Sequence, residues 1–420
     1  MSSNLFFKYK IHLLVLLEFF IFFYLGNKLE FIISPILYIA VCFLIAFNYL
    51  KTFINIDVNF NSYHSKKCSY ILFASAIILF SVWANKIIVL NPIDIKISDI
   101  IPYINDLYLK RLFNGEFVYN IAPGMGYGNW TPNYLTFHWL PFVISYFFQF
   151  DHRWTVLAVF FITVYIYMFH FISANNAKQY WFKASLPFLF LLLLFYKQPG
   201  NFAHTVELLI ASYYFLLAMF LIKNNVIGKS LGLTLTVLSR YIVVFHIPIA
   251  LVIEFYLNKK QLFKQIVTVV ILVSAFYIIP FLLKDNSIFF KGAAAYDLAA
   301  LGEWDGQSWQ QPNDSPFQLF QGLGFASWAY SFLNGSLDFK IYIFKIIMLS
   351  SCLMTILFLI IYFIKNKNKY KIGNWHLASL KIIITVILSF SLVPYSYLFW
   401  TNLVLSIVML GSINEIDKNT

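Results

Sequence analysis

The carboxylates of this chain gather in two stretches, and this grouping is the first feature that indicates chemistry. Ten of the 18 acidic residues lie in segments 91–133 and 284–339. These residues are Asp94, Asp99, Asp106, Glu116, Asp285, Asp297, Glu303, Asp305, Asp314 and Asp338. A carboxylate can act as a general base towards a hydroxyl group. Asp99 and Asp106 lie seven residues apart in the first segment, so on a helix both carboxylates can point the same way.

Arginine is so rare here that each position deserves an explanation. The chain has 30 lysines and arginines, and only Arg111, Arg153 and Arg240 are arginines. A guanidinium offers phosphate a planar, two-pronged donor that a lysine ammonium does not. Because Arg240 interrupts a long apolar stretch, we predict that it binds a phosphate group. Arg111 and Lys110, in the first acidic segment, are predicted to contact the same phosphate.

The overall composition restricts the class of protein. Of the 420 residues, 60% are hydrophobic and 11% are charged, and the mean hydropathy is +0.74. Soluble domains carry about 25% charged residues, so this chain cannot cover a water-facing surface of its size. The net charge of +12 comes mainly from lysines in short loops, which indicates membrane orientation rather than a nucleic-acid partner. The three scattered cysteines indicate neither disulfides nor a metal site, and we expect no metal ligands.

The apolar runs predict an all-α polytopic membrane protein that forms one integral-membrane domain over residues 1–420. A membrane-crossing helix needs about 20 mostly apolar residues, and on this basis we expect about 11–13 transmembrane helices. The runs lie at 11–27, 31–50, 70–90, 134–150, 154–173, 183–197, 204–222, 230–257, 265–283, 340–364, 377–393 and 395–412. Ser239-Arg240 interrupts the stretch 230–257, which favours two half-helices that meet at the outer face.

Lysine clusters predict the orientation in the bilayer. The clusters consist of Lys51, Lys66 and Lys67, of Lys259 and Lys260, and of Lys365, Lys367, Lys369 and Lys371. Cytoplasmic loops are enriched in Lys and Arg, so we place all three clusters in the cytoplasm. Segments 91–133 and 284–339 then form two loops on the outer face. The composition suits a multi-pass protein of a bacterial cytoplasmic membrane, with its functional site on the outer face.

The first outer loop combines a helix with a shaped loop. Ser98 or Asp99 is the expected N-cap of the helix, Pro102 lies in its first turn, and Gly115 follows its end. Apolar residues at helical spacing predict that this helix lies along the membrane interface. The following run, 123–134, is rich in Gly, Pro and aromatic residues and is typical of a loop that re-enters the membrane.

Several short strings resemble the GT-C superfamily of membrane glycosyltransferases. The strings are Ser98-Asp99, Tyr103, Asn114-Gly115-Glu116, Tyr119, a Pro/Tyr re-entry at 132–141, Lys197 to Asn201, Gly232-Leu233 and Leu238-Ser239-Arg240. The resemblance covers roughly residues 90–257. It is nearest to bacterial enzymes that use a polyprenyl-phosphate sugar, including a family of unknown function related to mannosyltransferases. The chain departs from the superfamily pattern in having no Asp-X-Asp pair and no histidine in its second outer loop.

The resemblance implies a GT-C-like fold and a hexosyltransferase activity. The hexose, with mannose favoured, would pass from a polyprenyl-phosphate donor to a lipid-linked or glycan acceptor on the outer face. The residue that matches the catalytic aspartate of the superfamily is Asp99, with Asp106 as the second candidate. The resemblance implies that no cofactor is required, although it leaves open whether a divalent metal ion is used. The resemblance also implies substrate contacts from Tyr103, Tyr119 and Asn201.

Other residues are expected to line the substrate site. Glu207 closely follows the turn at 200–201, and we expect it to contact the substrate. In the second outer loop, Trp304, Asp305 and Trp309 combine aromatic rings with a carboxylate. Rings stack on the apolar faces of pyranoses while polar groups bond the hydroxyls, so these three are predicted to bind sugar. A second interfacial helix is expected at 316–335.

Two other functions share parts of this pattern. An O-antigen-type polysaccharide polymerase or ligase has a similar number of spans and large outer loops, but such enzymes are expected to use arginines in those loops. Segment 284–339 has no arginine. A flippase or transporter for lipid-linked sugars would place charges along a central cavity and would show an internal repeat, and the sequence shows none.

Overall fold

The computed structural model describes residues 2–26, 31–52, 63–95, 98–125, 128–306, 316–320 and 323–413. These residues form an all-α bundle with one short antiparallel hairpin, β1 (Ala122–Met125) paired with β2 (Gly128–Trp130). The fold is that of a polytopic membrane protein.

Seven helices within the described residues are long and apolar enough to cross a membrane. They are α2 (Ile33–Leu50), α3 (Tyr63–Leu90), α8 (His152–Ile166) continued by η4 (Tyr167–Phe171), α9 (Ala177–Lys197), α14 (Lys259–Val273) continued by η6 (Ser274–Leu282), α17 (Leu337–Asn366) and α18 (Ile372–Ser389).

Shorter segments complete the bundle. Three of them are apolar: α12 (Val226–Val237), η5 (Tyr241–His246) with α13 (Ile247–Leu257), and η8 (Ser396–Phe399) with α19 (Trp400–Ser412). Two more are α1 (Ser2–Phe20) with η1 (Ile21–Leu25), and α11 (Glu207–Lys223).

The remaining elements are short or lie outside the parallel bundle. They are α4 (Ile101–Tyr103), η2 (Ile104–Leu109), α5 (Lys110–Phe113), α6 (Thr136–Trp139), η3 (Leu140–Phe142), α7 (Val143–Phe148), α10 (Pro199–His204), α15 (Ile288–Trp304), η7 (Phe317–Phe320) and α16 (Ala326–Phe332).

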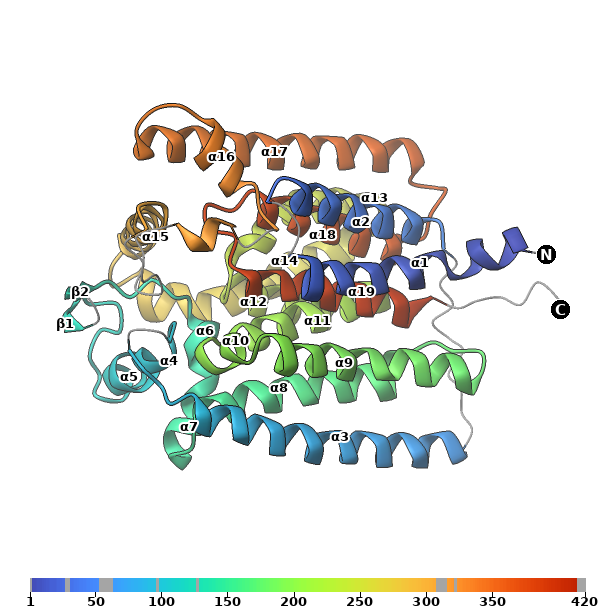
Figure 1. The fold of residues 1–420 in the computed structure, drawn as a ribbon, viewed down its shortest axis with the longest axis horizontal. Coiled ribbons are helices and arrows are strands. Elements are labelled where there is room, and N and C mark those ends of the chain that lie inside the picture. Colours follow the sequence, from blue (N-terminus) through green and yellow to red (C-terminus); the bar gives the residue numbers. More distant parts are fainter. Residues whose placement is uncertain are drawn as a thin grey trace.

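The two predicted outer loops gather at one end of the bundle (Figure 1). In that view α4, α5, β1, β2 and α15 lie at the left, and the end of α2, the start of α3 and the turn from α17 to α18 lie at the right. Helix α15 is seen nearly end-on, so it runs across the axes of the long helices. Two of the lysine clusters therefore lie at the end opposite to both acidic segments, as the sequence predicts.

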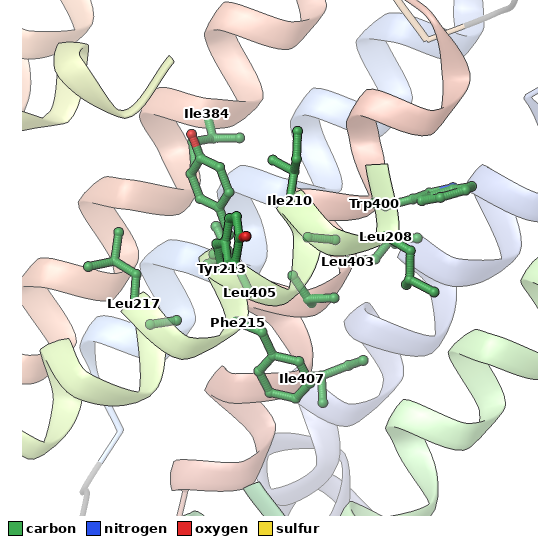
Figure 2. Packing of buried hydrophobic residues seen from close by; sticks show 14 of the residues in the cluster. Leu208, Ile210, Tyr213, Phe215, Leu217, Ile384, Trp400, Leu403, Leu405 and Ile407 are labelled. Carbon is green, nitrogen blue, oxygen red and sulfur yellow. The ribbon is translucent and has the colours of Figure 1, made fainter. Parts of the chain in front are cut away.

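A closely packed interior supports the end with the acidic segments. Helix α18 has 89% of its apolar window buried, whereas α14 has 11%, so α18 lies inside the bundle and α14 lies at its edge. Side chains of α11, α18 and α19 pack together in this interior, among them Leu208, Phe215, Ile384, Leu403 and Ile407 (Figure 2). The first turns of α11 and of η5 rest on this core.

A glycine sets the distance between α11 and α12. A Cβ atom added to Gly232 would lie 2.9 Å from the Cα atom of Leu217, closer than real Cβ atoms approach. Only a residue without a side chain lets the two helix backbones come this close. The approach places the C-terminal end of α12, and Arg240 just after it, beside the start of α11.

Some predicted elements differ from the observed ones. The expected span at 134–150 is wrong: it consists of α6, η3 and α7, because Pro141 cannot donate a backbone hydrogen bond and Gln149 has a positive φ of 51°. The stretch 230–257 is broken before η5, as expected. The interfacial helix expected at 316–335 is limited to η7 and α16, and α15 was not predicted.

A buried ion pair crosses the centre of the bundle. Lys381 Nζ donates to Glu18 Oε1 at 2.8 Å, and both side chains are fully buried. The Ser406 hydroxyl donates to the other Glu18 oxygen at 2.6 Å, and Lys381 also donates to the carbonyl of Asn402 at 3.0 Å. The pair joins α1, α18 and α19, and satisfies both charges within the apolar interior.

Removal of one partner should destabilise the bundle strongly. We expect Lys381→Met to lower the free energy of unfolding by about 3–5 kcal/mol, because it leaves the Glu18 carboxylate buried without its cation. SDS-induced unfolding, followed by tryptophan fluorescence, measures the change. The double variant Glu18→Gln/Lys381→Met should recover most of the loss.

A half-exposed pair provides the matched control for this measurement. Lys345 lies 2.7 Å from Asp297, and their side chains are 32% and 53% exposed. Lys345→Met should cost about 0–1 kcal/mol because water screens this pair. If Lys345→Met and Lys381→Met lowered the free energy of unfolding equally, the buried Glu18–Lys381 pair would not stabilise the bundle more than an exposed pair does.

The native cysteines allow the predicted orientation to be tested. Cys68 is exposed at the start of α3, whereas Cys42 and Cys352 are buried. A membrane-impermeant maleimide should label Cys68 only after the cells are permeabilised. In a Cys68→Ser background, Asn334→Cys, which is exposed between α16 and α17, should be labelled in intact cells. Labelling of Cys68 in intact cells would reverse the orientation.

Candidate functional site

Two carboxylates, an imidazole and a guanidinium meet at the end of the bundle that carries the acidic segments. One potential ligand atom from each of Asp99, His138 and Glu207 lies within 4.8 Å of the other two. The Arg240 guanidinium donates to Glu207 Oε1. We refer to these four residues as the carboxylate–arginine site. Each comes from a different part of the chain, and each lies in or next to a short helix or at a helix end.

The Glu207–Arg240 ion pair forms the base of the site. Glu207 is the first residue of α11, where the helix dipole favours a negative charge. Arg240 lies in extended backbone between α12 and η5, with φ −143° and ψ 108°, and its carbonyl accepts from the Tyr214 hydroxyl at 3.3 Å. The Glu207 side chain is 1% exposed and that of Arg240 is 23% exposed. A ligand can therefore reach the pair from the side of the arginine.

Asp99 is held by its backbone and by its side chain. Its N–H donates to the carbonyl of His204 at 2.8 Å, and the Ser98 hydroxyl lies 3.1 Å from His204 Nδ1. The Tyr134 hydroxyl donates to Asp99 Oδ1. The helix that begins with α4 has Ile100 as its N-cap and no side-chain cap. The expectation that Ser98 or Asp99 caps this helix is therefore wrong. The half-buried Asp99 side chain accepts the hydrogen bond from Tyr134 instead.

Two further tyrosines fix Tyr134. The Tyr134 N–H donates to the Tyr108 hydroxyl at 3.2 Å, and its carbonyl accepts from the Tyr119 hydroxyl at 3.0 Å. The Tyr108 ring stacks on Trp139 at 5.2 Å. The predicted re-entrant loop therefore ends in a rigid aromatic group that holds the phenol of Tyr134 against Asp99.

The tautomer of His138 follows from its contacts. Its Nδ1 atom lies 3.2 Å from the carbonyl oxygen of Ser239, and the Phe137 N–H donates to the Leu238 carbonyl at 2.8 Å. A carbonyl only accepts, so Nδ1 carries the proton and Nε2 has the lone pair. Nε2 is buried, and no described residue forms a hydrogen bond with it.

Burial and charge shift the pKa values of the site in opposite directions. Burial raises the pKa of Asp99, and the Tyr134 hydroxyl and the Arg240 guanidinium counteract part of that rise. Burial and the same guanidinium lower the pKa of His138 to about 3. The imidazole is therefore neutral near pH 7, and the Asp99 carboxylate is a stronger base than an exposed aspartate.

The second acidic segment reaches the site through two tyrosines. The Tyr395 hydroxyl donates to Glu303 Oε1 at 2.8 Å, and the rings of Tyr395 and Tyr397 stack at 5.2 Å. Tyr397 is close enough to Asp99, Glu207 and Arg240 to interact electrostatically with all three. These tyrosines therefore connect the end of α15 with the carboxylate–arginine site.

The predicted phosphate-binding and catalytic residues of the first outer loop divide into two groups. Asp99 lies in the site, whereas Asp106 and Lys110 are exposed on η2 and α5. Arg111 donates to three backbone carbonyls in residues 118–121. The Arg111 guanidinium therefore stabilises the turn after α5. This role differs from the predicted role of binding phosphate.

Three aromatic residues that were predicted to contact the substrate are held by other rings or by the backbone. Tyr103 stacks on Trp130 with ring centroids 4.1 Å apart, and Tyr119 holds Tyr134. Trp304 is fully buried and donates from Nε1 to the Leu392 carbonyl at 2.9 Å. A ring enclosed in this way has no open face for a pyranose, so the prediction for Trp304 is wrong.

The other predicted substrate residues have different positions. Asn201 donates to the Ser396 hydroxyl at 3.0 Å, next to Tyr397. Asp305 is exposed after the end of α15, and Trp309 lies outside the described residues.

Sequence reasoning missed four residues at the site. In the sequence His138 stands alone within an apolar run, and Tyr134 only ends the aromatic-rich run 123–134. Tyr395 and Tyr397 lie at the start of the apolar run 395–412, directly after Pro394, and that boundary is the available signal. For His138 no local signal exists, since its partners lie in distant segments.

Comparisons with known proteins found no match among family models, curated proteins or solved structures, so the function of this chain has to be inferred from the geometry of the site. The site itself offers a carboxylate base, a guanidinium that can bind an anion, and three atoms that could hold a metal ion.

Proposed function

We propose that this protein is a membrane glycosyltransferase that moves a hexose, with mannose favoured, from a polyprenyl-phosphate donor to a lipid-linked or glycan acceptor on the outer face. The main support is the meeting of Asp99 and Arg240, which lie in different predicted loops and spans. The sequence assigns to them the roles of base and phosphate-binding group. A ligand atom of Asp99 lies within 4.8 Å of one of Glu207, and the Arg240 guanidinium donates to that same Glu207 carboxylate.

Each residue has a defined part in the transfer. The acceptor hydroxyl attacks C1 of the donor hexose and forms the new C1–O bond. The bond between C1 and the phosphate oxygen breaks, and the phosphate leaves with the electron pair. Asp99 takes the hydroxyl proton, and the Arg240 guanidinium stabilises the negative charge that grows on the leaving phosphate.

The position of the site suits a lipid-linked donor. The carboxylate–arginine site lies at one end of an apolar bundle, beside elements that run across the helix axes. A donor whose tail lies in the bilayer presents its phosphate at this depth. The exposed apolar side chains of α14 and α17 supply the lipid-facing surface such a tail needs.

Substitution of Asp99 tests the proposal directly. With labelled polyprenyl-phosphate hexoses and a crude lipid or glycan acceptor, we expect Asp99→Asn to reduce kcat by about 10²–10⁴-fold, because the amide cannot accept the proton. The same assay on Asp106→Asn decides between the two aspartates, and little change is expected there, because Asp106 is exposed away from Arg240.

The control variant is Asp338→Asn, an exposed acid in the first turn of α17. Its transfer rate should match that of the wild type. If Asp99→Asn folds normally and retains full transfer, Asp99 is not the base. Movement of the lipid-linked sugar across the membrane without transfer would instead favour a flippase, and extension of a polymer would favour the polymerase.

Substitution of arginine tests the phosphate contact. Arg240→Lys keeps the charge that Glu207 needs but loses the two-pronged geometry. We expect kcat/KM for the donor to fall about 10–100-fold, since both donor binding and the leaving phosphate lose a contact. Arg111→Lys should leave the donor KM unchanged and affect only thermal stability, because Arg111 contacts backbone carbonyls. A raised donor KM in Arg111→Lys, with no change in Arg240→Lys, would instead identify Arg111 as the residue that binds the phosphate.

A further inference from the structure

Two buried acceptor atoms of the carboxylate–arginine site, and the buried donor Arg240 Nε, have no hydrogen-bond partner among the described residues. No described residue forms a hydrogen bond with Glu207 Oε2 or with His138 Nε2, and both side chains are 99% buried. Buried polar atoms nearly always have a partner, because desolvation without one is costly. Both acceptor atoms carry lone pairs, so their missing partner is a donor or a cation.

We propose that Asp99, His138 and Glu207 bind a divalent first-row transition ion, either Mn²⁺ or Zn²⁺. The combination of ligands favours these metals. Carboxylates bind Mg²⁺, Ca²⁺, Mn²⁺ and Zn²⁺, whereas imidazole favours transition ions and Zn²⁺. Ca²⁺ takes six to eight oxygen ligands, which this site does not provide.

The distances are compatible with coordination. Bonds from such an ion to carboxylate oxygen or imidazole nitrogen are about 2.0–2.2 Å. The potential ligand atoms lie within 4.8 Å of one another, so all three lie within about 2.8 Å of a common centre. A movement of each atom by about 0.6–0.8 Å or less towards that centre therefore brings all three into contact with one ion.

Each ligand is already oriented by a second contact. His138 Nδ1 donates to the Ser239 carbonyl, Tyr134 donates to Asp99, and Arg240 donates to Glu207. Metal-binding histidines characteristically donate their other N–H to a carbonyl or carboxylate, which fixes the ring and its tautomer. His138 has this arrangement.

The charge of the site gives the ion a role that rests on the proposed function. Two carboxylates and one guanidinium leave a net charge of −1, with His138 neutral, and this charge repels a phosphate. A divalent ion changes the sum to +1. The ion and Arg240 would then face the donor phosphate together, while three protein ligands leave coordination positions open for its oxygens.

Metal binding is compatible with the assigned base. A carboxylate offers about four lone-pair positions on its two oxygens. In Asp99 one of these accepts from Tyr134, one can contact the ion, and others can receive the proton of the acceptor.

The experiment uses full-length, tag-free protein in detergent, treated with EDTA and dialysed. Mn²⁺ is titrated and its free concentration is followed by electron paramagnetic resonance. We expect one Mn²⁺ per chain, displaced by Zn²⁺, and electron spin-echo modulation from one ¹⁴N nucleus of an imidazole. A purely structural histidine does not produce this modulation.

Three variants and a control test the ligands. His138→Ala should remove the ¹⁴N modulation and weaken Mn²⁺ binding by at least 10-fold, and Asp99→Asn and Glu207→Gln should weaken binding to a similar extent. His170→Ala, at an exposed position in η4, should bind like the wild type. Asp99→Asn keeps the test informative if loss of the Arg240 partner prevents Glu207→Gln from folding.

Two results would overturn the ion site: no stoichiometric Mn²⁺ or Zn²⁺ binding by the wild type, or equal affinity in wild type and His138→Ala. The proposed function fails separately. If the ion binds but no polyprenyl-phosphate hexose is transferred, the ion site stands and the transferase does not. Transfer that continues in EDTA, without measurable metal binding, supports the transferase and overturns the ion site.

Discussion

A charge inside a hydrocarbon layer needs a partner, and this constraint organises the whole bundle. Glu18 pairs with Lys381 at the centre, and Lys229 pairs with Glu254. These two pairs are almost completely enclosed. The Glu207–Arg240 pair obeys the same rule, but its arginine remains 23% exposed. The same physical requirement therefore produces enclosed ion pairs in two places and a partly exposed pair in another.

The carboxylate–arginine site forms where helices are interrupted. Asp99 precedes α4, His138 lies in the four-residue α6, Glu207 begins α11, and Arg240 separates α12 from η5. Helix ends leave backbone groups unpaired and are tolerated in a membrane protein only where protein or water satisfies them. The interruptions thus bring polar side chains to one end of the bundle. The close contact of α12 with α11 at Gly232 then fixes Arg240 beside Glu207.

The two proposals place different requirements on the same side chains. The transferase needs Asp99 as a carboxylate that accepts a proton and Arg240 as an anion-binding group. The ion site needs the free lone pairs of His138 and Glu207, which the transferase mechanism alone leaves unused. A cation at that position would explain why a site with two acids and one arginine could accept a phosphate.

The sequence by itself determined the apolar spans and the separation of lysine clusters from the acidic segments, and it singled out Asp99 and Arg240 as candidate site residues. These features follow from local composition, because a bilayer selects apolar runs and sorts charges by side. Tertiary structure alone decided that His138, Tyr134 and Tyr397 join them, that Arg111 serves the backbone and that Trp304 belongs to the core. Those roles depend on contacts between segments far apart in the chain, and no local pattern records which helix ends will meet.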